Sequence, residues 1–337
     1  MLACFWQRWL PALVKAIVIC KNIMKTRKHQ SAALVLILYW LLLAAKIVFA
    51  NDSGAEMGAS GLQLKKIENI SMEREDLYIS QKKIKVAYLF KNHSDKDITT
   101  EIAFPVPEYT TEDAQRGLPF DDFEVEVNGE KIKHNSEIKA LLRGKDYSAI
   151  LQKMGITIYD FGGFSEPLYK DFYQTLSEKD KKLLRSKGLV DENGYPLWKA
   201  SVKYYWTQTF PANSTTEIKH AYTPWSGYFY FTTDETADKN SFLFEKACAS
   251  QDIARWIRDM LAHKRNKVFV NTVAYILKTA NNWQGSIRDF HLVIEKNKNE
   301  KISLCFDGKL NKISDTQFES HIKDYIPKQN LMIYYLY

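Results

Sequence analysis

The stretch Ile79-Ser-Gln-Lys-Lys-Ile-Lys-Val-Ala-Tyr-Leu-Phe90 decides the fold class of this chain. Within it, Ile84, Val86 and Tyr88 occupy every second position, and Phe90 continues the series. Successive side chains of a β-strand point to opposite faces, so a period of two predicts a strand with one buried face.

The same alternation recurs along the rest of the chain, separated by turn residues. A strand over 98–104 stops at Pro105-Val106-Pro107, because proline cannot donate a hydrogen bond to a sheet. Asn128-Gly129 is a strong signal for a two-residue hairpin turn. Further strands are predicted over 200–210, 215–222, 228–232, 268–279, 290–295, 301–306 and 331–337. We therefore expect a mainly β protein, a β-sandwich-like body of antiparallel strands.

Two regions are predicted to be helical. In residues 136–190, apolar clusters and the Ser177–Asp180 capping box, followed by Gly188, indicate a helical insertion. Apolar residues spaced three and four apart from Ile253 to Leu261 predict an amphipathic helix over about 250–264.

These features divide the chain into four regions. Residues 1–50 form an N-terminal segment, and a β region follows over 51–135. The helical insertion covers 136–190, and a second β region with one helix covers 191–337.

Composition excludes several classes of protein. Of 337 residues, 45% are hydrophobic and 13% aromatic, which is enough to build a core and argues against disorder. The net charge of +7 resides in residues 1–50, which hold seven basic residues and no acidic one. The rest of the chain has 40 basic and 40 acidic residues, so we expect no nucleic-acid partner.

The N-terminal segment is typical of an export signal. Basic residues precede an apolar run from Ala32, and Val48-Phe49-Ala50 places small residues before a cleavage site between Ala50 and Asn51. A signal counted from Met24 has a normal length, so Met24 is the expected start. We expect a periplasmic protein; the alternative is an uncleaved inner-membrane anchor, which would be its only contact with a membrane.

Catalytic and metal-binding motifs are missing from the sequence. It contains no His-Glu-x-x-His, no Gly-x-Ser-x-Gly, no phosphate-binding loop and no zinc-spaced cysteines, so we expect neither metal nor cofactor. Asp122, Glu124 and Glu126 could form a carboxylate pair, but they alternate with apolar residues as on a solvated strand face.

Aromatic residues provide the candidate contact face. Tyr204 and Trp206 share one strand face, and Trp225, Tyr228 and Tyr230 follow in a second aromatic run. Such a face could stack against a glycan or a partner peptide. The alternative is that both strand faces are buried.

The cysteines predict one disulfide. Cys4 and Cys20 lie in the N-terminal segment, which leaves Cys248 and Cys305 in the exported body. An even pair in an exported protein normally forms a structural bridge.

Several segments resemble one family of exported bacterial proteins, the domain of unknown function 4424 family. They include Asn51–Glu56, Met72–Ser80, Ile102–Pro107 and Lys312–Glu319, and the resemblance extends in order over nearly all of residues 51–337. It implies export and a β-rich body, but no activity.

We therefore expect a non-enzymatic binding or envelope-associated protein whose partner is an envelope protein or glycan. The alternative is a hydrolase of envelope glycan or peptide, with carboxylates that come together only in the fold.

Overall fold

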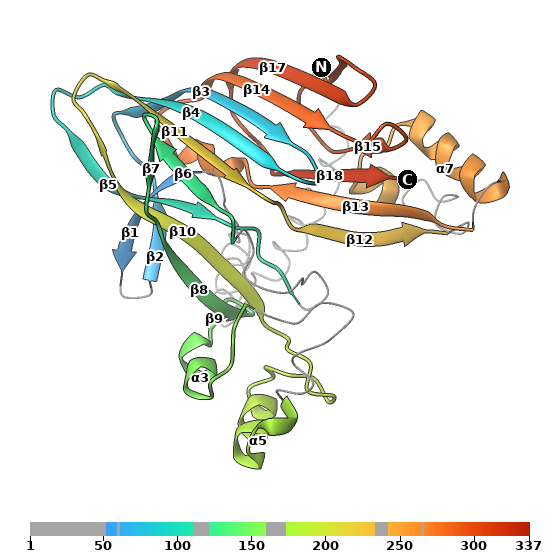
Figure 1. Cartoon of the computed structure of the whole chain (residues 1–337). Helices are drawn as coiled ribbons and strands as arrows, with labels where there is room; N and C mark the ends of the chain where they lie inside the picture. Colours follow the sequence, from blue (N-terminus) through green and yellow to red (C-terminus); the bar gives the residue numbers. More distant parts are fainter. Residues whose placement is uncertain (1–51, 59–60, 111–120, 160–172, 233–241, 264–265) are drawn as a thin grey trace, which may run out of the picture. The chain divides into compact units, whose positions relative to one another are not determined.

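Three β-sheets account for most of the regular secondary structure in the part of the chain that the structure describes (Figure 1). The structure is a computed structural model that describes residues 52–58, 61–110, 121–159, 173–232, 242–263 and 266–337. The predicted cleavage site at Ala50 and Asn51 lies outside the described residues, as do Met24, Cys4 and Cys20.

The largest sheet has eight strands and is mixed. Its strands, in spatial order, are β16 (Asn311–Lys312), β17 (Gln317–Tyr325), β14 (Ile287–Glu295), β3 (Ile70–Ile79), β4 (Ile84–Asn92), β11 (Thr215–Tyr222), β6 (Glu124–Val127) and β7 (Glu130–Ile132). The β3–β14 pair is parallel, and the other pairs of this sheet are antiparallel.

The two other sheets are antiparallel. The six-stranded sheet has the order β2 (Gly61–Lys65), β1 (Ser53–Gly58), β5 (Ile98–Pro105), β10 (Lys199–Phe210), β8 (Asn135–Leu142) and β9 (Lys145–Asp146). The four-stranded sheet has the order β12 (Ser226–Phe231), β13 (Val268–Tyr275), β18 (Leu331–Leu336) and β15 (Lys301–Ser303).

Helices are short except for one. They are α3 (Ser148–Lys153), α5 (Glu178–Ser186), α6 (Phe242–Glu245), α7 (Gln251–His263) and the 3-10 helix η2 (Lys278–Asn282). At the start of α5, the Ser177 hydroxyl accepts a hydrogen bond from the Asp180 backbone N–H at 3.1 Å, which caps the helix.

Two apolar clusters hold these elements together. The larger one lies between the eight- and six-stranded sheets, where rings such as Phe104 of β5 and Tyr222 of β11 pack with centroids 5.3 Å apart. The second lies beneath α7, whose Ile257 and Leu261 pack against Val268 and Leu336 of the four-stranded sheet. Burial of these faces stabilises the fold by about 25 cal/mol for each Å² removed from water. The mainly β, sandwich-like prediction is thereby confirmed.

A buried polar pair fixes the beginning of the described chain. The His220 imidazole Nε2 lies 2.9 Å from both carboxylate oxygens of Asp52, and neither side chain is exposed to solvent. Nearby, the Trp283 indole N–H donates to the Asp52 carbonyl oxygen at 2.7 Å, and the Asn282 amide donates to the Ser53 hydroxyl at 2.8 Å. These contacts attach the segment before β1 to the middle of the core.

The prediction of a helical insertion over 136–190 is wrong for the first part of that range. Residues 135–142 form strand β8 because β10 pairs with them from Lys199 to Tyr205, a long-range contact that overrides the local helix-like spacing. The predicted strand 268–279 ends at Tyr275 before η2, and the strand predicted over 301–306 ends at Ser303. Strand β17 and the β1–β2 hairpin were not predicted.

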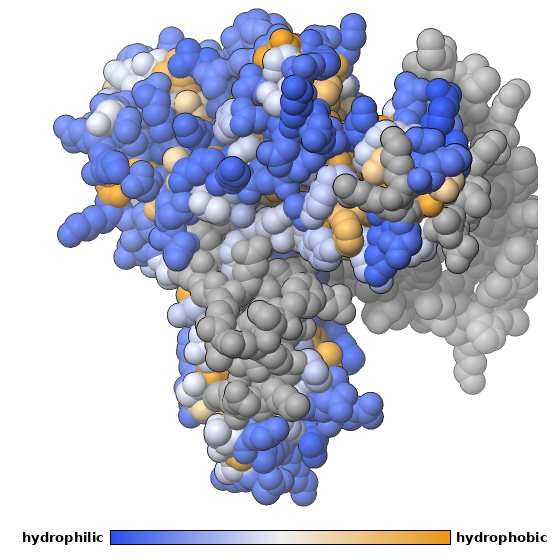
Figure 2. All heavy atoms as spheres, turned by 45° about the vertical axis from the view of Figure 1, so that its right-hand side comes forward, coloured by the Kyte–Doolittle hydropathy of each residue, from blue (hydrophilic) through white to orange (hydrophobic). Residues whose placement is uncertain are grey.

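The face visible in Figure 2 is mostly hydrophilic where it is coloured, and hydrophobic residues reach it in small, separate patches. Such patches are common on folded proteins in contact with water. In the described part of the chain, we find no helix with the length and apolar character needed to span a membrane.

Candidate binding surface on the four-stranded sheet

Strands β12 and β13 place aromatic rings side by side on one face of the four-stranded sheet. The antiparallel register sets Tyr230 opposite Phe269 and Tyr228 opposite Asn271. The alternate residues Phe229 and Phe231 point to the other face, where they pack in the cluster beneath α7. Helix α7 lies beside this sheet (Figure 1) and packs on that second face, whereas Tyr228 and Tyr230 on the first face are exposed.

We call Tyr228, Tyr230, Phe269 and Tyr337 the aromatic surface. The Tyr228 and Phe269 rings are nearly parallel, at 19° with centroids 5.8 Å apart. Tyr230 and Tyr337 also adjoin Phe269, with centroids 6.3 Å and 6.0 Å from its ring. The exposed fractions of Tyr228 and Tyr230 are 52% and 43%, whereas tyrosines in a core are nearly covered. Phe269 and Tyr337 are half-buried, so the four rings form one aromatic platform on which the two tyrosines of β12 are exposed.

Polar groups border this platform. The Lys267 ammonium lies 3.9 Å from the centre of the Tyr230 ring, within the range of a cation–π contact. The Asn271 amide donates to the Gln81 side-chain oxygen at 2.7 Å, which holds both amides beside the rings. The surface therefore combines ring faces with neighbouring hydrogen-bonding groups.

Two residues of the predicted contact face belong to the core instead. Tyr204 and Trp206 of β10 are each 3% exposed, since the eight-stranded sheet covers their face of β10. Tyr204 stacks on Phe123 with centroids 4.7 Å apart, and Trp206 packs edge-on against His220 at 5.4 Å. They cannot contact a partner while the fold is intact.

Trp225 lies apart from both groups. It is half-buried against Tyr109, with ring centroids 4.3 Å apart, in a hollow of about 230 Å³ that Gly227 and Thr272 also line. Gly227 alternates with Tyr228 along β12, so this hollow belongs to the opposite sheet face. Of the five predicted residues, the structure brings only Tyr228 and Tyr230 together.

Sequence reasoning missed Phe269 and Tyr337. Phe269 stands between two valines, with no polar neighbour to mark an exposed face, and Tyr337 follows a strand that is apolar on both faces. The aromatic residues themselves were the available signal, but only the pairing of β13 with β12 and β18 identifies which of them meet.

Asp122, Glu124 and Glu126, which the sequence placed on a solvated strand face, lie elsewhere, and each is paired with a lysine. Glu124 and Glu126 line a hollow of about 380 Å³ on the outer face of the eight-stranded sheet. Glu124 pairs with Lys131 at 2.9 Å, and Glu126 pairs with Lys219 at 3.7 Å.

Asp122 is unsuited to donate a proton. Burial acts to raise the pKa of the Asp122 carboxyl, but hydrogen bonds from Lys83 and Thr223 outweigh it and hold this pKa below its ordinary value. A general acid for glycoside hydrolysis needs a raised pKa. These three carboxylates therefore lend no support to the hydrolase alternative. In the described ranges, no group of three or more potential metal ligands comes together.

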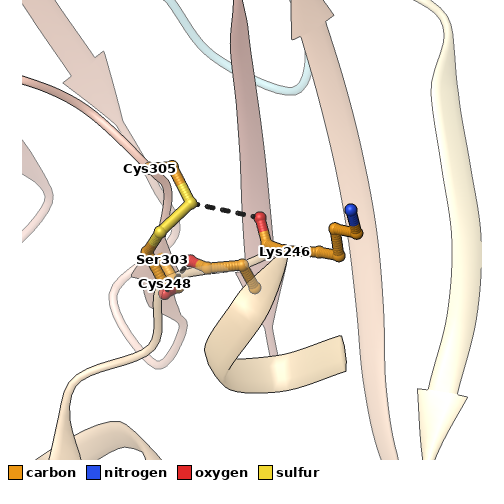
Figure 3. Close-up of a disulfide and its surroundings, with 5 residues drawn as sticks. Lys246, Cys248, Ser303 and Cys305 are labelled. Atoms are coloured by element: carbon orange, nitrogen blue, oxygen red, sulfur yellow. Dashed lines mark hydrogen bonds between the residues drawn. A yellow bond between two sulfur atoms is a disulfide. The ribbon is translucent and has the colours of Figure 1, made fainter. Parts of the chain in front are cut away.

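Cys248 and Cys305 form a disulfide, with Cα atoms 5.0 Å apart (Figure 3). It joins the turn before α7 to the segment after β15. Beside it, the Ser303 hydroxyl donates to the Ala247 carbonyl oxygen at 2.7 Å, and Cys305 Sγ lies 3.3 Å from the Lys246 carbonyl oxygen. Such a bond persists in oxidising compartments and is rare in the cytosol.

Comparison with known proteins gives one specific match. The model of the family described as "Domain of unknown function (DUF4424)" matches residues 50–334. No match is found among the curated proteins.

Solved structures are similar only at a distance. A proposed nutrient-binding protein from Legionella pneumophila is 14% identical, with a TM-score of 0.44 over 85% of this chain and 70% of that chain. An M1 zinc metallopeptidase from Deinococcus radiodurans is 6% identical, with a TM-score of 0.26 over 80% of this chain and 43% of that chain. At these scores neither structure bears on the function of this chain.

Proposed function

The chain belongs to the DUF4424 family, and we propose that it is a periplasmic, non-enzymatic protein that binds an envelope glycan through its aromatic surface. One observation carries this proposal: the exposed rings of Tyr228 and Tyr230 adjoin the half-buried rings of Phe269 and Tyr337, whereas Phe229 and Phe231 of the same strand pack beneath α7. Exposed aromatic groups of this size on a folded protein typically mark a contact site.

The chemistry of the surface fits a sugar. Each sugar ring has an apolar C–H face that can cover an aromatic ring, and hydroxyl groups around its edge that need hydrogen-bond partners. Tyr228 and Tyr230 supply ring faces, and Asn271, Gln81 and Lys267 supply polar groups beside them. The surface is long enough for neighbouring sugars because the rings adjoin one another across β12 and β13.

The proposed compartment rests on two features. The N-terminal segment has the order of a secretory signal, and the Cys248–Cys305 bond is the type that survives outside the reducing cytosol. In the periplasm, the glycans available to this surface are those of the envelope.

The test is binding to purified peptidoglycan sacculi and, separately, to purified lipopolysaccharide. We expect one of the two to retain the protein in a sedimentation assay. Tyr228→Ala combined with Tyr230→Ala should weaken that binding by at least roughly tenfold, because each stacked ring contributes about 1 kcal/mol. Tyr195→Ala is the matched control, since Tyr195 is 40% exposed in a separate turn.

Two results would refute the proposal. One is retention by neither glycan, especially if cross-linking in intact cells captures a protein on the aromatic surface instead. The other is retention that the double tyrosine variant leaves unchanged.

A further inference from the structure

A second candidate site adjoins the disulfide, whose Cys248 is one of its lining residues. A groove of about 760 Å³ is lined by α7, strand β15 and the β16–β17 hairpin, together with the segments on either side of β15. Its volume is in the range of small-molecule sites. The four rings of the aromatic surface contribute no residue to its lining, although Gln81 joins the two places, since it accepts from Asn271 and donates to Glu300.

The walls of the groove are apolar and come from both hydrophobic clusters. Ile253 and Trp256 of α7 pack on the cluster beneath that helix, whereas Leu304 and Leu310 pack on the cluster between the two large sheets. All four side chains are half-buried, and each has a part that faces the groove. The groove is therefore the place where the two cores meet solvent, and an apolar ligand could bury surface against both.

Positive charge gathers at the same place. Four lysines line the groove, Lys296, Lys298, Lys301 and Lys312. Burial, together with the neighbouring Lys301 and Lys312 charges, lowers the pKa of the Lys296 ammonium. The lining of the groove thus holds four ammonium groups against two carboxylates, those of Glu300 and Asp315.

The acidic residues of the groove leave part of this charge uncompensated. The Glu300 carboxylate accepts hydrogen bonds from the Gln81 and Asn297 amides, and the Asp315 carboxylate is paired with Lys312 at 2.8 Å. Lys298 and Lys301 are exposed, and neither has an ion-pair partner among the residues that the structure describes. Two ammonium groups thus remain available to a ligand beside the apolar walls.

The disulfide holds the two sides of the groove together. Cys248 itself lines the groove and precedes α7, and its disulfide partner Cys305 (Figure 3) directly follows the lining residue Leu304. This covalent link fixes the separation of walls that belong to different clusters. A preformed groove binds with a smaller loss of entropy than one that must close around its ligand.

We propose that this groove binds an amphipathic anion, an apolar chain or ring that ends in a carboxylate or a phosphate. The apolar part lies between Trp256 and Leu310, and the anionic head reaches Lys298 and Lys301. A neutral molecule of the same length gains only the apolar contacts.

The test uses the full mature chain and displacement of the fluorescent anion 8-anilinonaphthalene-1-sulfonate. Decanoate and decyl phosphate carry the proposed chemistry, and the tighter of the two identifies the head group. Decanol and decyltrimethylammonium have the same chain with no charge or a positive charge. We expect at least one anion to displace the probe roughly tenfold more tightly than decanol does.

Charge variants locate the site. The double variant Lys298→Gln, Lys301→Gln should bind the anion roughly tenfold more weakly than the parent and bind decanol with unchanged affinity. Both lysines are exposed, so the variant should fold like the parent, which its thermal unfolding checks. The matched control is Lys179→Gln with Lys182→Gln, which removes two exposed lysines from α5.

Three results would overturn this assignment. They are equal affinity for decanol and both anions, anion binding that the Lys298/Lys301 variant leaves unchanged, and an equal loss in the α5 control. The rings of the aromatic surface and the lysines of the groove share no residue, so glycan binding can fail while the groove still binds its anion, and the reverse also holds.

Discussion

Replacement of Asp52 by alanine should be among the most destabilising single changes in this protein. The Asp52 carboxylate is the partner of His220 Nε2, at 2.9 Å, and neither side chain touches solvent. Aromatic rings surround the imidazole, with Phe123 and Trp206 at centroid distances of 5.1 Å and 5.4 Å. Without Asp52, the Nε2 atom would face apolar rings with no group to bond.

The expected loss follows from that geometry. Removing the Asp52 side chain leaves the buried His220 Nε2 without its hydrogen-bond partner, which costs about 1–3 kcal/mol, and more where the remaining group is charged. Burial raises the pKa of the Asp52 carboxyl, and the neighbouring His220 acts against this rise without overcoming it. Asp52→Asn keeps the shape and a hydrogen-bond acceptor, and should cost less than half as much as alanine.

The assay is urea unfolding at pH 7, followed by the loss of β-sheet circular dichroism. A double-mutant cycle of Asp52→Ala and His220→Phe isolates the pair, since phenylalanine suits the ring-lined site of His220. The double variant should be at least about 2 kcal/mol more stable than the sum of the single losses implies. A coupling energy near zero, or an Asp52→Ala loss below about 1 kcal/mol, would refute this reasoning.

Three further predictions concern pH and redox state. Burial acts to raise the pKa of the Glu137 carboxyl, but the Leu62 N–H and the Lys203 ammonium outweigh burial and lower this pKa. The stability that Glu137 contributes is therefore present above pH 4.5 and is lost as pH falls. Glu137→Gln should cost about 1 kcal/mol at pH 7 and less at pH 3.5, measured by urea unfolding at each pH. Burial raises the pKa of Tyr325 to about 12, so stability should fall as pH rises from 10 toward 12, and Tyr325→Phe should reduce that fall, measured by urea unfolding at each pH. Opening the Cys248–Cys305 loop of 57 positions should cost about 4 kcal/mol, and calorimetry with and without reductant checks this value.

Local patterns were sufficient where one face of an element is simply buried. The period of two from Ile84 to Phe90 identified β4, whose alternate residues are indeed in the core. The apolar stripe from Ile253 to Leu261 identified α7, which buries Ile257 and Leu261. In both elements a single neighbour covers one face, so the sequence period and the burial pattern agree.

Long-range pairing was beyond such reasoning. Ile138, Leu141 and Leu142 have helix-like spacing, yet β10 draws them into a sheet. The prediction of the contact face was partly wrong for a related reason. Alternation shows that Tyr204 and Tyr228 each lie on one face of a strand, but it does not show which of the two faces another element covers. Tyr204 meets the eight-stranded sheet, and Tyr228 meets solvent, because of segments distant in the sequence.

The parallel pairing of β3 with β14 also constrains the order in which the molecule can form. Strand β3 can pair with β4 early because the two are adjacent in sequence. The other edge of β3 stays unpaired until residues 287–295 are present and pair with it. Contacts of such long range make folding slow, and an open edge in the meantime can pair with another chain. A chain that stops before β14 would retain β4 and β11 but expose β3 permanently. We therefore expect C-terminal truncations to aggregate, even when they spare the aromatic rings of β12 and the whole of the six-stranded sheet.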